Sequence, residues 1–254
     1  KVFEFFEAME GLVDTFEKDQ GSIFDSTRLS DEHRETAGES RRLLLATTGA
    51  LLLPGARAQA FDHTHAAWTA LLRKHVQPLR GGQASQVRYA GMAADRAALK
   101  AYLDSLSAVG ESSFAAFGRA QQMAFLINAY NAFTVELILT RWPKLESIKD
   151  LGSLLQSPWK PKWVPLLGGK VSLDDIEHAM LRQRGRYDDP RVHFAVNCAS
   201  IGCPALREEA FDAARLDAQL DEQALRFMSD RTRNRYDAAA GRLQVSKIFD
   251  WFGE

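Results

Sequence analysis

Apolar residues recur along this chain mostly at helical spacing. Residues 65–75 (HAAWTALLRKH) place Trp68 and Leu71 on one stripe, which predicts an amphipathic helix. A second helix is predicted from Asp95 onward, where three leucines and a tyrosine share one face. We expect a loop with a short strand at 87–89 between these two helices.

Residues 119–142 give the strongest helix prediction. This segment is apolar on nearly all sides, so it should be a central buried helix that ends before Pro143. Two amides, Asn128 and Asn131, lie three residues apart on one face of it. A buried amide without a partner costs about 1–3 kcal/mol. The two amides therefore either bond neighbouring backbone and fix it to the helix, or line a polar pocket and orient a catalytic histidine.

The C-terminal half alternates short strands with helices. We expect a hairpin that turns at Gly168-Gly169, a helix capped by Ser172 and Asp175, a buried strand, a further helix and an edge strand. Their predicted ranges are 162–171, 172–184, 192–197, 211–229 and 243–245. With the first half, they predict a helix-rich single α+β domain over residues 61–254, with a small antiparallel sheet around a buried central helix.

The composition excludes several classes of function. The 254 residues carry a formal net charge of −1, which gives no electrostatic argument for nucleic acid or an anionic membrane. Two cysteines are too few for a disulfide-rich scaffold or a four-cysteine zinc site. The chain has no P-loop, no GxGxxG after a strand and no HExxH. We therefore expect no cofactor and no nucleic-acid partner.

Residues 40–60 resemble an export signal. Arg41-Arg42 precede an apolar run over 43–53, and Ala58-Gln59-Ala60 has the small-x-small form that a signal peptidase accepts. The start is similar to a twin-arginine signal, and the run is too short to span a bilayer. A buried core helix is the alternative. We expect a protein of the bacterial periplasm or cell envelope, without an integral membrane span, whose mature chain starts near Phe61.

The termini add two expectations. Because export signals begin at the true N-terminus, residues 1–39 are expected to come from an upstream start of translation and to lie outside the mature fold. The alternative is that residues 1–39 are a real part of the protein, which would defeat export. The chain starts at Lys1 and stops at Glu254, which favours a fragment of a longer protein.

Thiol chemistry is concentrated between residues 189 and 204. Cys198 and Cys203 follow an apolar run that carries His193, at the end of the predicted strand. Strand alternation sets His193 and Cys198 on opposite faces, so His178 is an equally good base for a nucleophilic Cys198. The alternatives are a Cys198–Cys203 disulfide, which an exported protein permits, and a zinc site, for which the spacing supplies no further ligands.

Glu177 is the second polar group in apolar surroundings. It falls on the apolar stripe formed by Leu173, Ile176 and Met180. A carboxylate there is costly unless it is paired or borders a cavity. Arg191 and His193 are candidate partners, and a buried structural ion pair is the alternative to a catalytic role.

Four segments of the chain, taken in order, form a recognisable set. They are FLINAYNAFTVELIL (125–139), VSLDDIEHAMLR (171–182), DPRVHFAVNCASIGCPAL (189–206) and VSKIFDWFGE (245–254). Together they resemble a family known as domain of unknown function 547, found in bacteria and plants. The resemblance spans residues 120–254 and implies a single α+β domain of unestablished activity. A papain-like cysteine hydrolase is one hypothesis for such domains, although no cysteine here precedes the histidines at a helix start. The polar positions that the resemblance assigns to the family are Asn128, Asn131, Glu177, His178, Arg191, His193, Cys198, Ser200 and Cys203.

Two function classes remain open at this stage. The first is a thiol-dependent hydrolase or transferase that acts on an amide or thioester bond, with Cys198 as nucleophile. The second is a non-catalytic binding or scaffold module for a small-molecule or peptide ligand, with a disulfide loop. In the first class the base is His193 or His178, the orienting carboxylate is Glu177, and Asn128 or Asn131 is a positioning donor. Arg191, Ser200 and Cys203 complete the predicted binding residues, and no metal site is expected.

Overall fold

The computed structural model describes residues 60–145, 148–152, 157–200 and 202–251. The chain divides into two units, Lys1–Ala60 and Phe61–Glu254, and every element described below belongs to the second. The predicted upstream extension lies outside the described residues, as does the signal-like segment apart from Ala60.

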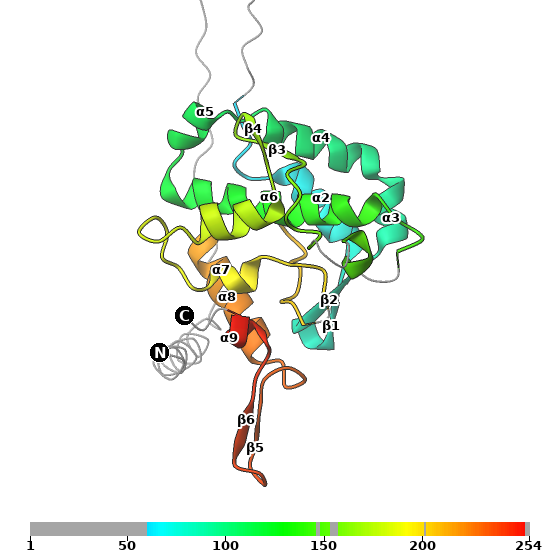
Figure 1. The fold of residues 1–254 in the computed structure, drawn as a ribbon, viewed down its shortest axis with the longest axis vertical. Helices are drawn as coiled ribbons and strands as arrows, with labels where there is room; N and C mark the ends of the chain where they lie inside the picture. Colours follow the sequence, from blue (N-terminus) through cyan, green and yellow to red (C-terminus); the bar gives the residue numbers. More distant parts are fainter. Residues whose placement is uncertain (1–59, 146–147, 153–156, 201, 252–254) are drawn as a thin grey trace, which may run out of the picture. The chain divides into compact units, whose positions relative to one another are not determined.

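Helices make up about half of the described part of the chain, as expected of a helix-rich fold (Figure 1). The α-helices are α2 (Ala66–His75), α3 (Tyr89–Ala94), α4 (Arg96–Ser107), α5 (Glu111–Ala115), α6 (Arg119–Leu139), α7 (Val192–Ala195), α8 (Leu216–Met228) and α9 (Ile248–Trp251). Three further helices are η1 (Arg80–Gly82), η2 (Ile148–Leu151) and the π-helix η3 (Asp175–Leu181). The predicted strand at 87–89 is wrong at Tyr89, which begins α3.

The strands form three separate antiparallel pairs in the described residues, so the fold is α+β as expected, with its sheet divided. The pairs are β1 (Val76–Leu79) with β2 (Ala84–Val87), β3 (Val164–Leu166) with β4 (Gly169–Val171), and β5 (Arg235–Asp237) with β6 (Arg242–Gln244). The β3–β4 hairpin turns at Leu167 and Gly168, one residue before the predicted pair. Both have positive φ, 54° and 80°, as a type I′ turn requires.

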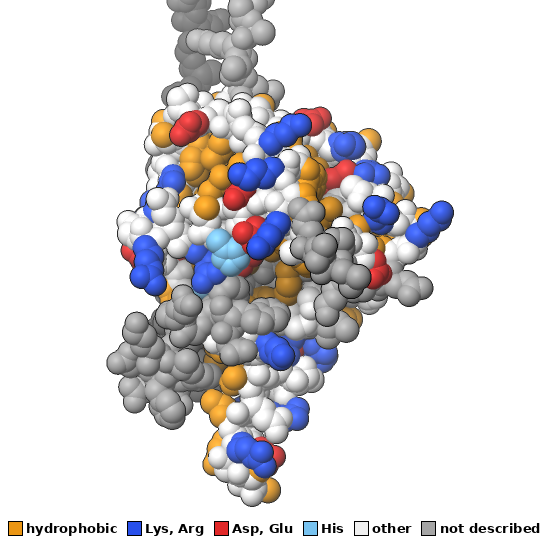
Figure 2. All heavy atoms as spheres, viewed as in Figure 1, with side chains coloured by type: hydrophobic (Ala, Val, Ile, Leu, Met, Phe, Trp, Pro, Cys, Tyr) orange, Lys and Arg blue, Asp and Glu red, His pale blue; other side chains and the backbone are white. Residues whose placement is uncertain are grey.

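The β5–β6 hairpin extends away from the helices (Figure 1). Tyr236 and Leu243 lie directly opposite each other in its register and are 63% and 55% exposed. Apolar side chains are accordingly visible on this hairpin in the space-filling view, while acidic and basic side chains are interspersed over the helical part (Figure 2). This face therefore carries no large patch of one charge.

Helix α6 is the buried centre of the described domain, as predicted. Nearly every side chain from Met123 to Leu139 is buried, and α4 and η3 pack against the helix. Its single acid, Glu136, is also buried and is held by Arg96, whose Nε and Nη2 lie 3.1 and 2.6 Å from the carboxylate oxygens. Pairing of this kind meets the condition under which a buried charge is tolerated.

The two amides of α6 form hydrogen bonds with backbone groups, so of their two predicted roles the structure shows the one in which they fix neighbouring backbone to the helix. Asn128 donates to the carbonyl oxygen of Phe211 at 2.8 Å and accepts from its N–H at 3.0 Å. Asn131 donates to the carbonyl oxygen of Ala195 at 2.9 Å and accepts from the N–H of Asn197 at 2.8 Å. Each amide thus satisfies one donor and one acceptor of another segment, and fixes that segment against α6.

The predicted strand at 192–197 is wrong, because Val192–Ala195 forms the single helical turn α7. The side chain of Asp189 accepts the N–H of Arg191 at 3.0 Å, and its carbonyl accepts the N–H of Val192 at 3.3 Å, so the chain already turns before α7 begins. An apolar run this short has no periodicity that separates a buried strand from a buried helical turn. The correction matters because strand alternation no longer separates His193 from Cys198.

The helix after Ser172 begins as predicted but continues differently. Ser172 and Asp175 form the reciprocal capping box, with both hydrogen bonds at 2.9 Å. Beyond it the chain forms the π-helix η3, in which the N–H of Arg182 bonds the carbonyl of Glu177 at 3.1 Å, five residues back. Its buried side chains, Ile176 and Leu181, are accordingly five apart. The predicted stripe of Ile176 and Met180 assumed α-helical spacing.

Helix α8 begins at Leu216, five residues later than the predicted start at 211. The N–H of Asp212 bonds the side chain of Gln219 at 2.8 Å, and Phe211 is bonded to Asn128. These side-chain bonds occupy backbone groups that would otherwise take part in the first turn of the helix.

Replacing Asn128 with alanine should cost about 2–5 kcal/mol of unfolding free energy, because both backbone groups of the buried Phe211 lose their partner. Urea unfolding measures this, and Gln86→Ala, at an exposed amide of β2, is the control. Equal stability of the two variants would contradict the backbone role of Asn128.

Replacing Gly91 with alanine should destabilise the protein by about 1–3 kcal/mol, although alanine normally favours a helix. A Cβ at this position would lie 2.7 Å from Nδ1 of His75, whose Nε2 is held by Asp95 at 2.7 Å. Gly169→Ala, where nothing lies within 4 Å of the added Cβ, is the matched control in thermal unfolding. A stabilised Gly91→Ala variant would show that the His75 ring moves freely.

Candidate functional site

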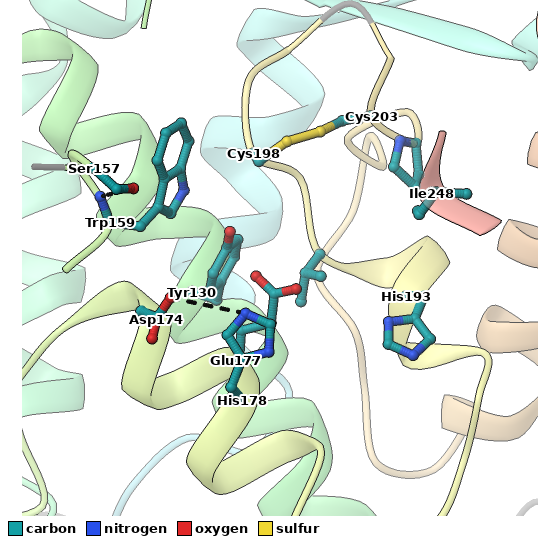
Figure 3. A pocket seen from close by; sticks show the side chains of 12 residues that line it. Tyr130, Ser157, Trp159, Asp174, Glu177, His178, His193, Cys198, Cys203 and Ile248 are labelled. Carbon is teal, nitrogen blue, oxygen red and sulfur yellow. Dashed lines mark hydrogen bonds and ion pairs between the residues drawn. A yellow bond between two sulfur atoms is a disulfide. The ribbon is translucent and has the colours of Figure 1, made fainter. Parts of the chain in front are cut away.

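A cavity of about 310 Å³ lies between α6, η3, α7 and the loop that carries both cysteines (Figure 3). Its described lining includes acidic, imidazole and aromatic side chains together with apolar ones. The lining residues are Tyr130, Ser157, Trp159, Asp174, Glu177, His178, His193, Val196, Cys198, Cys203, Pro204 and Ile248. The volume falls at the lower end of the range for small-molecule sites.

All four residues predicted to be catalytic line this cavity: Glu177, His178, His193 and Cys198. His193 and Cys198 can border the same space because α7 is a helical turn rather than a strand. Cys203, predicted as a binding residue, lies there as well.

The remaining predicted binding residues lie elsewhere. Asn128 and Asn131 are enclosed and bond backbone, as described above. Ser200 is exposed in the loop between the cysteines, where its carbonyl accepts the N–H of Cys203 at 3.0 Å. Arg191 lines a second cavity, of about 660 Å³.

Arg191 is surrounded by acids at that second cavity. Its guanidinium bonds Asp189 at 2.8 Å, Asp217 at 2.7 Å and Asp221. These bonds, with the bond to Asp189 as the largest cause, raise the pKa of Arg191 above its usual range. Arg191 therefore does not partner Glu177 in the manner predicted, and it connects α7 to α8 instead.

Cys198 and Cys203 form a disulfide, with their Cα atoms 6.1 Å apart. Cys203 is buried, at 6% exposure, and Cys198 is half-buried. Asn197 supports this loop from within, because its side chain donates to the carbonyl of Pro204 at 2.5 Å and accepts the N–H of Ala199 at 2.8 Å. In this state the sulfur of Cys198 is bonded, and no free thiol borders the cavity.

Glu177 projects into the cavity from η3 (Figure 3). Burial raises the pKa of this carboxyl, while the charge on His178, the Tyr130 hydroxyl and the charge on Arg182 act in the opposite direction. The cavity position is one of the two environments predicted for a carboxylate on that apolar stripe. A carboxyl with a raised pKa in a cleft is typical of functional sites.

The two histidines differ in environment. Burial, assisted by the charges of Arg182 and His178, lowers the pKa of His193 to about 4, so its imidazole is neutral near pH 7. His178 is more exposed, and its Nδ1 lies 2.6 Å from a guanidinium nitrogen of Arg182. Because a guanidinium only donates, Nδ1 of His178 is the acceptor. Its Nε2 lies 3.8 Å from a carboxylate oxygen of Asp174.

Sequence reasoning missed the aromatic and apolar wall of the cavity. Tyr130 lies between Asn128 and Asn131 on α6 and is 1% exposed, and burial raises its pKa well above the usual range. Trp159 is held near η3, because its carbonyl accepts the N–H of Asp174 at 3.1 Å. In its apolar segment Tyr130 looks like a core residue, and only its polar neighbours could have indicated a site. Trp159 stands among prolines and lysines of a loop, a pattern that indicates no site.

The described residues hold neither a cluster of metal-binding side chains nor a helix suited to cross a membrane. No group of three or more His, Cys, Asp or Glu side chains is placed to hold a metal ion. Within the same part of the chain, no helix has the length and apolar character needed to cross a membrane.

Comparison with known proteins gives one finding. A model of the family described as "Protein of unknown function, DUF547" matches residues 114–228. No curated protein and no solved structure matches the chain. The matched range includes three of the four segments that carry the resemblance in the sequence, and the fourth, at 245–254, lies beyond it. Residues 114–228, which supply every described residue of the first cavity except Ile248, are therefore a domain of the DUF547 family.

Proposed function

We propose that residues 61–254 are a ligand-binding module whose site is the cavity beside the Cys198–Cys203 disulfide. The observation that carries this proposal is the disulfide in the cavity wall. It occupies the sulfur that a thiol enzyme would use, while carboxyl, imidazole, phenol and indole groups line the same cavity. The volume suits a small molecule or the end of a peptide.

The way the walls are held supports a preformed binding site. Asn131 fixes residues 195–197 to α6, Asn197 fixes the cysteine loop internally, and the Ser172–Asp175 box fixes the start of η3. A site that is already ordered loses little conformational entropy when a ligand enters.

A thiol-dependent hydrolase or transferase is the second candidate, favoured by the fact that Cys198, His193, His178 and Glu177 line one cavity. This activity requires prior reduction of the disulfide. The Cys198 thiol would then attack the acyl carbon of an amide or thioester. A histidine would take the thiol proton and return it to the leaving amine or thiol, and water would release the acyl group.

Iodoacetamide mapping separates the two candidates. For a binding module, we expect neither cysteine to be alkylated before reduction and both to be alkylated after it, at ordinary thiol rates. The chain has only two cysteines, so the readout by mass spectrometry is unambiguous. Cys203→Ala, which leaves Cys198 as a free thiol, is the matched variant. If its alkylation is much faster than that of a free cysteine near pH 7, the hydrolase is favoured and the binding module is rejected.

We also propose that the module acts in the bacterial periplasm or cell envelope. The support comes from the twin-arginine-like segment at 40–60, from the disulfide, which is typical of oxidising compartments, and from the start of the compact unit at Phe61. That start coincides with cleavage after Ala60.

Expression of the whole chain in a bacterial host tests this location. We expect a periplasmic product whose N-terminus, read by mass spectrometry, is Phe61. Replacing Arg41 and Arg42 with lysine should keep the uncleaved chain in the cytoplasm, whereas Arg34→Lys, upstream of the pair, should change nothing. Cleavage of the double variant would indicate the general secretory route, and an uncleaved cytoplasmic wild-type chain would refute export.

A further inference from the structure

Apart from its histidines, the charged side chains in the described lining of the first cavity are acids. Asp174 and Glu177 are its acids, and its described lining includes no lysine or arginine. His193 adds no charge near neutral pH, since its pKa lies at about 4. Arg182 lies outside the described lining, where its guanidinium bonds Nδ1 of His178 and its charge also acts on Glu177. The cavity is therefore suited to a positive group.

Two aromatic side chains accompany these acids. Trp159 and Tyr130 lie on the same side of the cavity as Asp174 and Glu177, whereas His193 and Ile248 lie on the opposite side (Figure 3). Aromatic rings attract ammonium groups through the negative potential of their faces, and this attraction changes affinity by roughly two- to thirtyfold. The combination of carboxylates with aromatic rings distinguishes an organic cation from a metal ion, for which the described residues offer no group of three donors.

The rest of the cavity suits an apolar body. Val196, Pro204 and Ile248 line it together with the disulfide. At roughly 30 Å³ per water-sized group, about 310 Å³ holds roughly ten non-hydrogen atoms. A ligand of that size would direct its charged end to the acids and its hydrocarbon part to the opposite wall.

We propose that this cavity binds small organic cations, with an ammonium group placed between Asp174 and Glu177 and against the rings of Tyr130 and Trp159. This inference rests on the binding function proposed above and names its class of ligand. Asp174 contributes less than Glu177, because its side chain is 39% exposed and is shared with His178.

Titration calorimetry, which measures binding affinity, tests the proposal with three probes of similar shape. The probes are 2-phenylethylammonium, 2-phenylethanol and phenylacetate, which share an aromatic body and differ in the charge of the end group. We expect the ammonium to bind at least tenfold more tightly than the alcohol, and the carboxylate to bind weakest. The indole N–H signal of Trp159 in NMR spectra, assigned with Trp159→Phe, reports whether a probe enters the cavity.

Variants assign the effect to named side chains. Glu177→Gln, close in shape to the native residue, should weaken ammonium binding about tenfold and leave alcohol binding unchanged. Glu111→Gln, at an exposed position outside the cavity, is the matched control. Trp159→Leu should weaken the ammonium more than Trp159→Phe does, because only phenylalanine keeps an aromatic face. Thermal unfolding confirms that each variant is folded.

The outcomes separate this inference from the binding function itself. If the alcohol or carboxylate moves the Trp159 signal and binds as tightly as the ammonium, or if Glu177→Gln changes nothing, the cation inference is wrong and the binding module stands. A second set of probes carries the same three kinds of end group, ammonium, alcohol and carboxylate, on a cyclohexylmethyl body. If no probe of either set moves the Trp159 signal, the binding function is rejected as well.

Discussion

The site depends on a constraint within helix α6, where two amides have no access to water. Asn128 and Asn131 are 0% and 3% exposed, so their hydrogen bonds must be made inside the protein. Both find them in main chain far along the sequence, at Phe211 and at Ala195 and Asn197. Contacts to main chain fix the position and direction of a segment whatever its side chains are. The cysteine loop begins directly after the second contact, so its place follows from α6.

The long periodic elements were predictable from the sequence, and the short ones were not. Helices α2, α4 and α6 have enough turns for apolar spacing to identify them, and Leu167-Gly168-Gly169 marks the β3–β4 turn closely. The run at 192–195 is one turn long, so its hydrophobicity indicated burial without indicating conformation. The π-helical spacing of η3 is also invisible in a pattern that α-helical spacing fits almost as well.

The candidate site was predictable where polar residues stood in apolar segments. Glu177 and His193 were found for this reason, and in the structure burial shifts the pKa of both toward the uncharged form, upward for the carboxyl and downward for the imidazole. Aromatic residues give no such signal. Tyr130 could not be distinguished from a core residue, and Trp159 could not be distinguished from an ordinary loop residue. The partner predicted for Glu177, Arg191, is held instead by three aspartates that lie close to it only in the fold.

The π-helix η3 makes the chemistry of the cavity sensitive to chain length. A π-helix closes its hydrogen bonds over one residue more than an α-helix does, so the segment between Ser172 and Arg182 holds one residue in excess of α-helical register. The loss of one residue would let an ordinary α-helix form between the same two ends. The side chains between those ends would then be spaced at about 100° around the axis, so a different set of them would face the cavity. Which carboxyl and imidazole groups face the cavity therefore depends on the number of residues between Ser172 and Arg182 as much as on which residues they are.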